Sequence, residues 1–276
     1  MTNPKRQNIL LAYPAEDKRI EAFPPSFPVQ RKLKGVRCYV RWVEDLPILL
    51  SSYGIPFSYM EHIQAALLEL PPVPWDGELY VHGWPQERIN SATKRKVNKN
   101  EDSILVEYHI FDVFAQPLQE SRLKALTTLL DGVEHPIYLV ETEWTTKEEW
   151  VPICSSYLKE GYEGIMLRHP QGKYISRSPA YRSPHLLKYK PTEKDEYLIV
   201  GVKEGEGWAK GMLGAFLVNS GEVEFAVGTG PALTKASRSA LWNNRSSLVG
   251  RPLLVKHEPI ETVGGIPICT VAVEVL

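Results

Sequence analysis

Alternating hydrophobic and polar positions predict short strands through the first two thirds of the chain. Residues 36–43 (VRCYVRWV) alternate with the two-residue period of a strand, and they follow a short extended segment at residues 27–30. Further strands are expected at residues 75–81, 104–114, 164–168 and 186–190.

Helical patterns interrupt these strands at residues 58–70, 119–130 and 146–161. The first helix should begin at the capping-box pattern Ser58-x-x-Glu61 and stop before Pro71. Strands mixed with helices in this way predict an antiparallel α+β domain over residues 1–192.

The polar, turn-prone run PTEKD at residues 191–195 is the best candidate for a hinge. Short strands are expected beyond it at residues 197–203, 213–219, 223–227, 253–257 and 268–275, with one helix at 233–242. Five strands and one helix outline a small β-barrel such as an OB-fold. We therefore predict a second domain over residues 193–276.

Composition limits what the chain can be. Its 276 residues are 43% hydrophobic and carry a formal net charge of -1, so any contact with nucleic acid must come from local basic patches. Three widely spaced cysteines, Cys38, Cys154 and Cys269, fit neither a disulfide framework nor a zinc site and are expected to be reduced. No secretory signal is visible, and no apolar stretch approaches the roughly 20 residues that cross a bilayer.

Five short clusters carry the candidate chemistry: KLKGVR at residues 32–37, DGEL at 76–79, FD at 111–112, EGIM at 163–166 and KYK at 188–190. An amine such as that of Lys32 attacks phosphorus only when it is deprotonated, and neighbouring cations favour that form. Lys188 and Lys190 share one strand face, so they could hold a phosphate and help to discharge Lys32. Each lysine alone is better read as solvated surface, but that reading is poor for the whole ordered set.

Carboxylates occur beside these lysines. Asp76 and Glu78 share a strand face and suit Mg²⁺ or a ribose hydroxyl, and Glu163 is a third candidate. Taken singly, Asp-Gly and Glu-Gly are more often turns than ligands. Phe111 could stack on a purine, although a lone aromatic is more often part of the core.

The five clusters, in this order, resemble the nucleotidyltransferase motifs of ATP-dependent polynucleotide ligases. The resemblance covers nearly the whole chain and looks closest to the small phage-type ATP-dependent DNA ligases. It extends through GELYVHG at 77–83, INS at 89–91, EGEGW at 204–208, LGA at 213–215, FAVGTG at 225–230 and VGR at 249–251. The runs in the second domain favour DNA ligases over RNA ligases or capping enzymes.

The resemblance implies roles for individual residues. Lys32 would carry AMP, Gln30 would read the amino group of adenine, and Phe111 would stack on the base. Arg37 and Glu78 would contact the ribose or the nick phosphate.

Further roles follow for the phosphate and the metal. Lys188 and Lys190 would grip the α-phosphate, while Glu163, with Glu78 as the second candidate, would hold Mg²⁺ or Mn²⁺. ATP would first adenylylate Lys32, AMP would move to a 5′-phosphate, and a 3′-hydroxyl would then displace it.

The implied partner is nicked double-stranded DNA, bound by a monomer in the cytoplasm of a bacterial or phage-infected bacterial cell. Its phosphates would meet Arg37, Arg41 and the basic run of Lys94, Arg95, Lys96 and Lys99. A merely solvated basic face is an equally good reading of that run.

Three positions depart from the family pattern. Lys34 stands where Asp or Asn is usual, and we hypothesise that it partly substitutes for a metal ion by keeping Lys32 neutral. Ser52 stands where many relatives carry Arg, which leaves nick gripping to Arg37 or Arg41. Ile268 replaces a basic residue, so self-adenylylation is expected to be weak or to borrow Arg251 or Lys256.

Two other interpretations stay open. An RNA ligase or capping-type nucleotidyltransferase would share the chemistry of the first domain. A degenerate ligase, retained as a nicked-DNA binding protein, would be consistent with the three departures.

Overall fold

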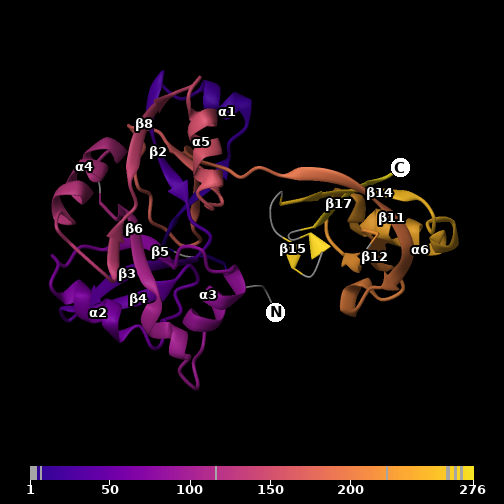
Figure 1. Cartoon of the computed structure of the whole chain (residues 1–276), viewed down its shortest axis with the longest axis horizontal. Helices are drawn as coiled ribbons and strands as arrows, with labels where there is room; N and C mark the ends of the chain where they lie inside the picture. Colours follow the sequence, from indigo (N-terminus) through magenta and orange to yellow (C-terminus); the bar gives the residue numbers. More distant parts are fainter. Residues whose placement is uncertain are drawn as a thin grey trace. The chain divides into compact units, whose positions relative to one another are not determined.

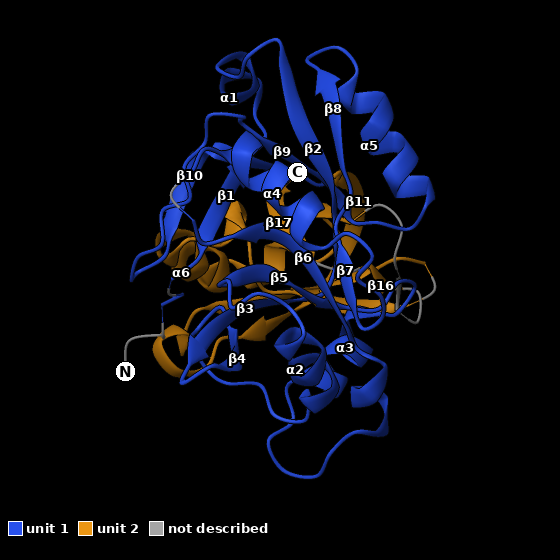
Figure 2. Ribbon diagram, turned by 90° about the vertical axis from the view of Figure 1, so that its left-hand side faces the viewer, with its two compact units in different colours: residues 1–190 blue, residues 191–276 orange. Residues whose placement is uncertain are grey.

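The computed structural model describes residues 5–6, 8–115, 117–221, 223–258, 262–263, 266–267 and 270–276 (Figure 1). The chain divides into two compact units, Met1–Lys190 and Pro191–Leu276, which are coloured separately in Figure 2. Each unit is described by itself below.

The first unit contains two five-stranded sheets. One sheet has the order β1 (Leu10–Pro14), β10 (Tyr181–Tyr189), β9 (Gly164–Arg168), β2 (Ser26–Lys32) and β8 (Thr142–Thr146). The other has the order β4 (Leu46–Ser51), β3 (Val36–Val43), β5 (Trp75–Tyr80), β6 (Glu107–Val113) and β7 (Ile137–Leu139). Both sheets are mixed rather than purely antiparallel, because β1 runs parallel to β10 and β6 runs parallel to β7.

Helices cover the outer faces of both sheets (Figure 1). The helices α1 (Asp17–Glu21) and α5 (Trp150–Lys159) contribute to the core of the first sheet, in which Ile20 and Trp150 pack with Phe27. The second sheet packs against α2 (Glu61–Leu68), α3 (Gln86–Thr93) and α4 (Gln119–Leu129). A short 3₁₀ turn, η1 (Glu101–Leu105), follows α3.

Strand β3 shows how the sequence pattern positions the site. Val36, Cys38 and Val40 point into the core of the second sheet, as the alternation predicts. Arg37, on the opposite face, is therefore directed away from that core and lines a cavity.

A charged network is buried beneath the second sheet. Asp112 on β6 accepts hydrogen bonds from Arg122 Nε at 2.8 Å and Arg168 Nη1 at 2.7 Å, and all three side chains are almost fully buried. Gln119 Oε1 accepts from both guanidiniums, at 2.7 and 3.1 Å. Because Arg168 lies on β9 and Asp112 on β6, this network ties the two sheets together.

The second unit is an open antiparallel sheet among the residues described. Its order is β13 (Glu224–Val227), β12 (Leu213–Asn219), β11 (Glu193–Glu204), β14 (Pro252–His257) and β17 (Val271–Val275). The remaining elements are α6 (Lys235–Asn243), the pair β15 (Thr262–Val263) and β16 (Ile266–Pro267), and the 3₁₀ turns η2 (Gly207–Ala209), η3 (Pro231–Leu233) and η4 (Arg245–Ser247). Phe216, Val218 and Leu253 lie in its separate core.

Several expected boundaries were wrong for identifiable reasons. The helix expected from Ser58 begins only at Glu61, because Tyr59 has a φ of 63° and Met60 occupies the N-cap position. Residues 193–195, expected within a hinge, begin β11 and pair with β14. The helix expected from residue 233 begins at Lys235, since Thr234 accepts a hydrogen bond from Ser237 N at 3.1 Å as the N-cap.

Cys38 and Cys154 are buried free thiols, whereas Cys269 lies outside the described residues. None of the helices described is both long enough and apolar enough to span a membrane.

The Asp112 network generates a prediction about stability. Replacing Asp112 with Asn leaves two buried guanidiniums without their carboxylate, so we expect a loss of about 3–5 kcal/mol in the free energy of unfolding. Urea titration followed by circular dichroism measures this loss. The control is Asp102→Asn, which breaks an Asp–Arg pair with Arg88 at the surface and is expected to change stability little. Equal effects of the two substitutions would contradict the structural role assigned to the network.

Candidate active site

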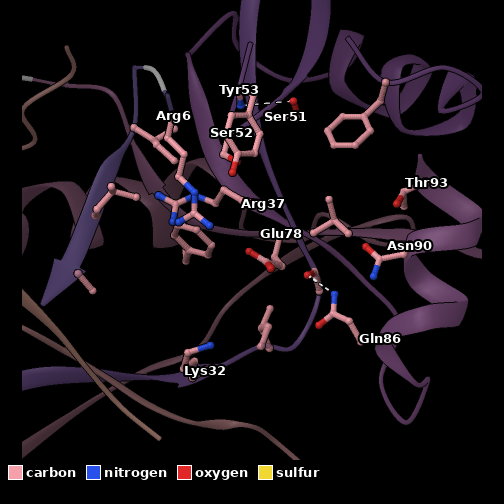
Figure 3. A pocket seen from close by; sticks show the side chains of 18 of the residues that line it. Arg6, Lys32, Arg37, Ser51, Ser52, Tyr53, Glu78, Gln86, Asn90 and Thr93 are labelled. Atoms are coloured by element: carbon pink, nitrogen blue, oxygen red, sulfur yellow. Dashed lines mark hydrogen bonds between the residues drawn. The ribbon is translucent and has the colours of Figure 1, made fainter. Parts of the chain in front are cut away.

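A cavity of about 800 Å³ opens in the first unit, and both sheets contribute to its walls (Figure 3). Strands β2, β9 and β10 supply one side, and β3, β5 and β6 the other, together with residues 51–58 and α3. Lys and Arg side chains line much of it, whereas Glu78 is the one acidic residue among the lining residues described. The cavity therefore suits an anionic ligand.

Lys32 is the last residue of β2 and faces this cavity. Its Nζ forms an ion pair with Glu163 Oε2, and Lys190 Nζ lies 2.6 Å from Glu163 Oε1. The backbone repeats the link, because Glu163 N donates to Lys32 O at 3.0 Å. The two lysines thus share one partly buried carboxylate. We had expected neighbouring lysines to set the surroundings of Lys32. In the structure the carboxylate of Glu163 lies between Lys32 and Lys190 as well.

Gly164 is required by this arrangement. It pairs with Lys32, has a φ of 153°, and a Cβ at this position would lie 2.2 Å from Tyr189 O. A side chain here would push apart the segments that carry Glu163 and Lys190.

Asp76 and Glu78 differ in their surroundings although they share a strand face. Asp76 is fully buried and accepts from Arg37 Nε at 2.6 Å, Arg37 Nη2 at 2.5 Å and Tyr174 Oη at 2.5 Å. It is therefore committed to a structural ion pair, and our suggestion that it binds metal or ribose was wrong. Glu78 faces the cavity (Figure 3), where burial raises its pKa to about 7 against the opposing influence of Arg37 and Lys32.

Gln30 and Phe111 form the inner wall. The Gln30 amide donates to Thr142 Oγ1 at 2.9 Å and accepts from Arg168 Nε at 2.6 Å, which fixes its orientation. The Phe111 ring lies under the guanidiniums of Arg37 and Arg168, at 4.6 and 5.5 Å from the ring centre.

The other sequence candidates lie in several places. Lys94, Arg95, Lys96 and Ser52 line the cavity, whereas Lys34 and Arg41 are not among its described lining residues. Lys99 lies 3.5 Å from Glu61 in an exposed ion pair. Of the residues named as substitutes in the second unit, Arg251 donates to Leu276 O, while Ile268 itself lies outside the described residues.

Lys188 and Lys190 have different surroundings despite their spacing. Lys190 joins Glu163, whereas Lys188 lines the cavity, where burial and then the charges of Arg182 and Arg6 lower its pKa. Arg6, Arg168 and Arg182 were not singled out from the sequence. The sequence did contain a signal for Arg168, because alternation along β9 places its side chain on the same face as Met166, and both residues line the cavity.

Comparisons with known proteins agree on one family. Residues 10–190 match the family described as ATP dependent DNA ligase domain. The DNA ligase of African swine fever virus, isolate Pig/Kenya/KEN-50/1950, is 31% identical over 263 residues, which cover 87% of this chain and 61% of that protein. A DNA ligase of Halobacterium salinarum is 27% identical over 220 residues, covering 70% of this chain and 37% of that protein. The chain thus spans about three fifths of the viral relatives it matches.

Solved structures show the same fold. A structure of a Lig E DNA ligase aligns with a TM-score of 0.78 at 22% identity, covering 98% of this chain and 99% of that one. The Chlorella virus DNA ligase-adenylate aligns with a TM-score of 0.54 at 22% identity, covering 98% of this chain and 100% of that one. Since the family match includes more than half of the residues, the chain belongs to the ATP-dependent DNA ligase family.

Proposed function

We propose that the protein is an ATP-dependent DNA ligase that seals nicks in duplex DNA through a lysyl-AMP intermediate. The observation that carries the proposal is the Lys32–Glu163–Lys190 arrangement beside a basic cavity large enough for a nucleotide. Family membership supports the same chemistry.

Lys32 is the nucleophile in this proposal. It attacks the α-phosphorus of ATP, pyrophosphate leaves, and a phosphoramide bond joins AMP to Nζ. Glu163 touches Nζ and is placed to hold or accept the proton that the amine loses. Lys190 then meets the α-phosphate as a positive charge, with Lys188 further along the cavity wall.

The adenosine would occupy the inner part of the cavity. Phe111 offers a ring face to adenine, and Gln30 presents an amide held in one orientation beside it. Glu78 is the carboxylate that lines the cavity, and it would accept a hydrogen bond from a ribose hydroxyl. Arg37 is anchored by Asp76 and presents its charge toward the same space.

The residues present fit a divalent cation. The two oxygens of Glu163 already contact positively charged groups, and Glu78 supplies a second carboxylate with hard oxygen donors at the cavity. We propose that these two carboxylates hold Mg²⁺ or Mn²⁺, which when bound neutralises charge on phosphoryl oxygens. Lys32 and Lys190 supply positive charge at the same place from the chain itself.

We also propose that the second unit is an OB-fold domain and that its partner is nicked DNA, contacted from the first unit by Lys94, Arg95 and Lys96. One hydrogen bond supports closure of this sheet into a barrel. Ala272 N in β17 donates to Thr229 O, just beyond β13, at 2.7 Å. This bond brings together the two edges of the open sheet.

The first prediction concerns the nucleophile. Incubation with ATP labelled at the α-phosphate is expected to label the wild-type protein covalently and to leave Lys32→Ala unlabelled on a denaturing gel, because the proposal assigns the attack on ATP to the Lys32 amine, which lines the cavity beside Glu163. The matched control, Lys18→Ala, removes an exposed lysine of α1 and should label normally. If the wild-type protein takes no label, only the interpretation as a nicked-DNA binding protein is left. A second assay distinguishes a DNA ligase from an RNA ligase: a DNA ligase is expected to seal all-DNA nicks but not all-RNA nicks.

The second prediction concerns Glu163. Glu163→Gln removes the charge shared by Lys32 and Lys190, so the labelling rate should fall by about ten- to a hundredfold and its dependence on Mg²⁺ concentration should weaken. Quenched time courses over a magnesium series measure both effects. Glu148→Gln, at an exposed position outside the cavity, should follow the wild type. An unchanged magnesium response in Glu163→Gln would rule out this carboxylate as a metal ligand.

The third prediction uses the raised pKa of Glu78. The folded protein binds the proton of this carboxyl more tightly than the unfolded chain, so the stability it contributes at low pH is lost as the pH rises through its pKa of about 7. Glu78→Gln should therefore gain stability relative to wild type between about pH 5 and about pH 8. Thermal unfolding across this range tests the sign, with Glu87→Gln as a control in α3. A pH-independent difference would show that Glu78 titrates normally.

A further inference from the structure

Pairing of charges separates the basic residues of the cavity into two kinds. Four lining cations already have carboxylate partners: Arg31 with Glu141, Lys32 with Glu163, Arg37 with Asp76, and Arg168 with Asp112. These ion pairs hold the walls together. Among the residues that the structure describes, no ion pair joins the other six lining cations to a carboxylate. These are the run of Lys94, Arg95 and Lys96 and a group of three, Arg6, Arg182 and Lys188.

The backbone brings these three cations to one edge of the cavity, which we call the edge cluster. Strand β1 runs parallel to β10, so that Leu11 pairs with Arg182. Just before β1, Ala180 N donates to Arg6 O at 2.7 Å, which anchors the Arg6 backbone against the approach to β10. Figure 3 shows the Arg6 side chain extending toward Arg37 and the segment of Ser52 and Tyr53.

Like charges held this close repel one another unless water or an anion separates them. The pKa of Lys188 is lowered by burial and then by the charges of Arg182, Arg6 and Lys190, which is a sign of that repulsion. The two guanidiniums are planar donors that match phosphate oxygens, and the ammonium adds a point charge. Phosphate oxygens would therefore relieve the repulsion and satisfy the donors together.

We infer that Arg6, Arg182 and Lys188 form a second phosphate site in the cavity, separate from the Lys32–Glu163–Lys190 arrangement, and that its ligand is a terminal phosphate. That phosphate can come from two sources: the 5′-phosphate of a DNA nick or the outer phosphates of ATP. The identity of these sources rests on the proposed function, whereas the site itself rests on the edge cluster.

Arg6→Ala is the decisive variant, because the Arg6 side chain makes no hydrogen bond within the described part of the chain and its loss should leave the fold intact. Lys5→Ala is the matched control, since it removes the neighbouring exposed charge, which is not among the lining residues. Arg182→Gln, with Arg177→Ala as its control, provides a second pair, and thermal unfolding checks that Arg182→Gln keeps its fold after losing the bond to Ala12 O.

The first arm measures binding of nicked duplexes that carry either a 5′-phosphate or a 5′-hydroxyl, by fluorescence anisotropy in EDTA without ATP. The second arm measures covalent labelling as a function of ATP concentration. Loss of a phosphate contact should weaken binding by about ten- to a hundredfold. If the source is the nick, Arg6→Ala and Arg182→Gln lose the preference for the 5′-phosphate duplex. If the source is ATP, both variants need about ten times more ATP for half-maximal labelling.

Either pattern supports the site and assigns its source. The inference is overturned if both variants match Lys5→Ala and Arg177→Ala in both arms. Failure of the proposed function looks different: the wild-type protein then takes no label from ATP. In that case the anisotropy arm alone decides, and a 5′-phosphate preference that survives in both variants overturns the second site.

Discussion

The sharing of one carboxylate by two ammonium groups is the interaction on which the site depends. Glu163 contacts both Lys32 and Lys190, and these residues come from the ends of three neighbouring strands, β2, β9 and β10. The strands can meet so closely because Gly164 has no side chain. A single backbone requirement thus sets the geometry of Lys32, Lys190 and the carboxylate that they share.

Charge pairing also separates structure from chemistry elsewhere in the cavity. Asp76 and Asp112 are buried and hold arginines, so they are parts of the scaffold. Glu78 lines the cavity, and Glu163 contacts Lys32, which also lines it, so both carboxylates lie beside the space that a ligand would occupy. Buried charges are stable only when paired, whereas groups that bind a substrate must keep some capacity free. The distribution of partners is therefore a better guide to function than the presence of a charged residue.

The sequence predicted much of this arrangement because the relevant patterns are local. The strands at 36–43 and 164–168 were found with their bounds, and Lys32, Glu78 and Phe111 line one cavity. Strand β1 was missed because its five residues have no clear alternation, and its pairing with β10 is formed across the whole first unit. Arg6 and Arg182 were missed for the same reason. Asp76 was misjudged because spacing in one strand cannot show that Arg37 and Tyr174 occupy it.

The parallel pairing of β1 with β10 has a consequence for synthesis of the chain. Leu10 reaches its partner Tyr181 only after nearly the whole first unit has left the ribosome, and β2 likewise waits for β9. Such non-local contacts form slowly, because loop closure must precede them. The nascent chain therefore carries unpaired strand edges for most of its translation. Lys32, at the end of β2, cannot meet Glu163 until this late closure, so the proposed site is assembled only with a completed first unit.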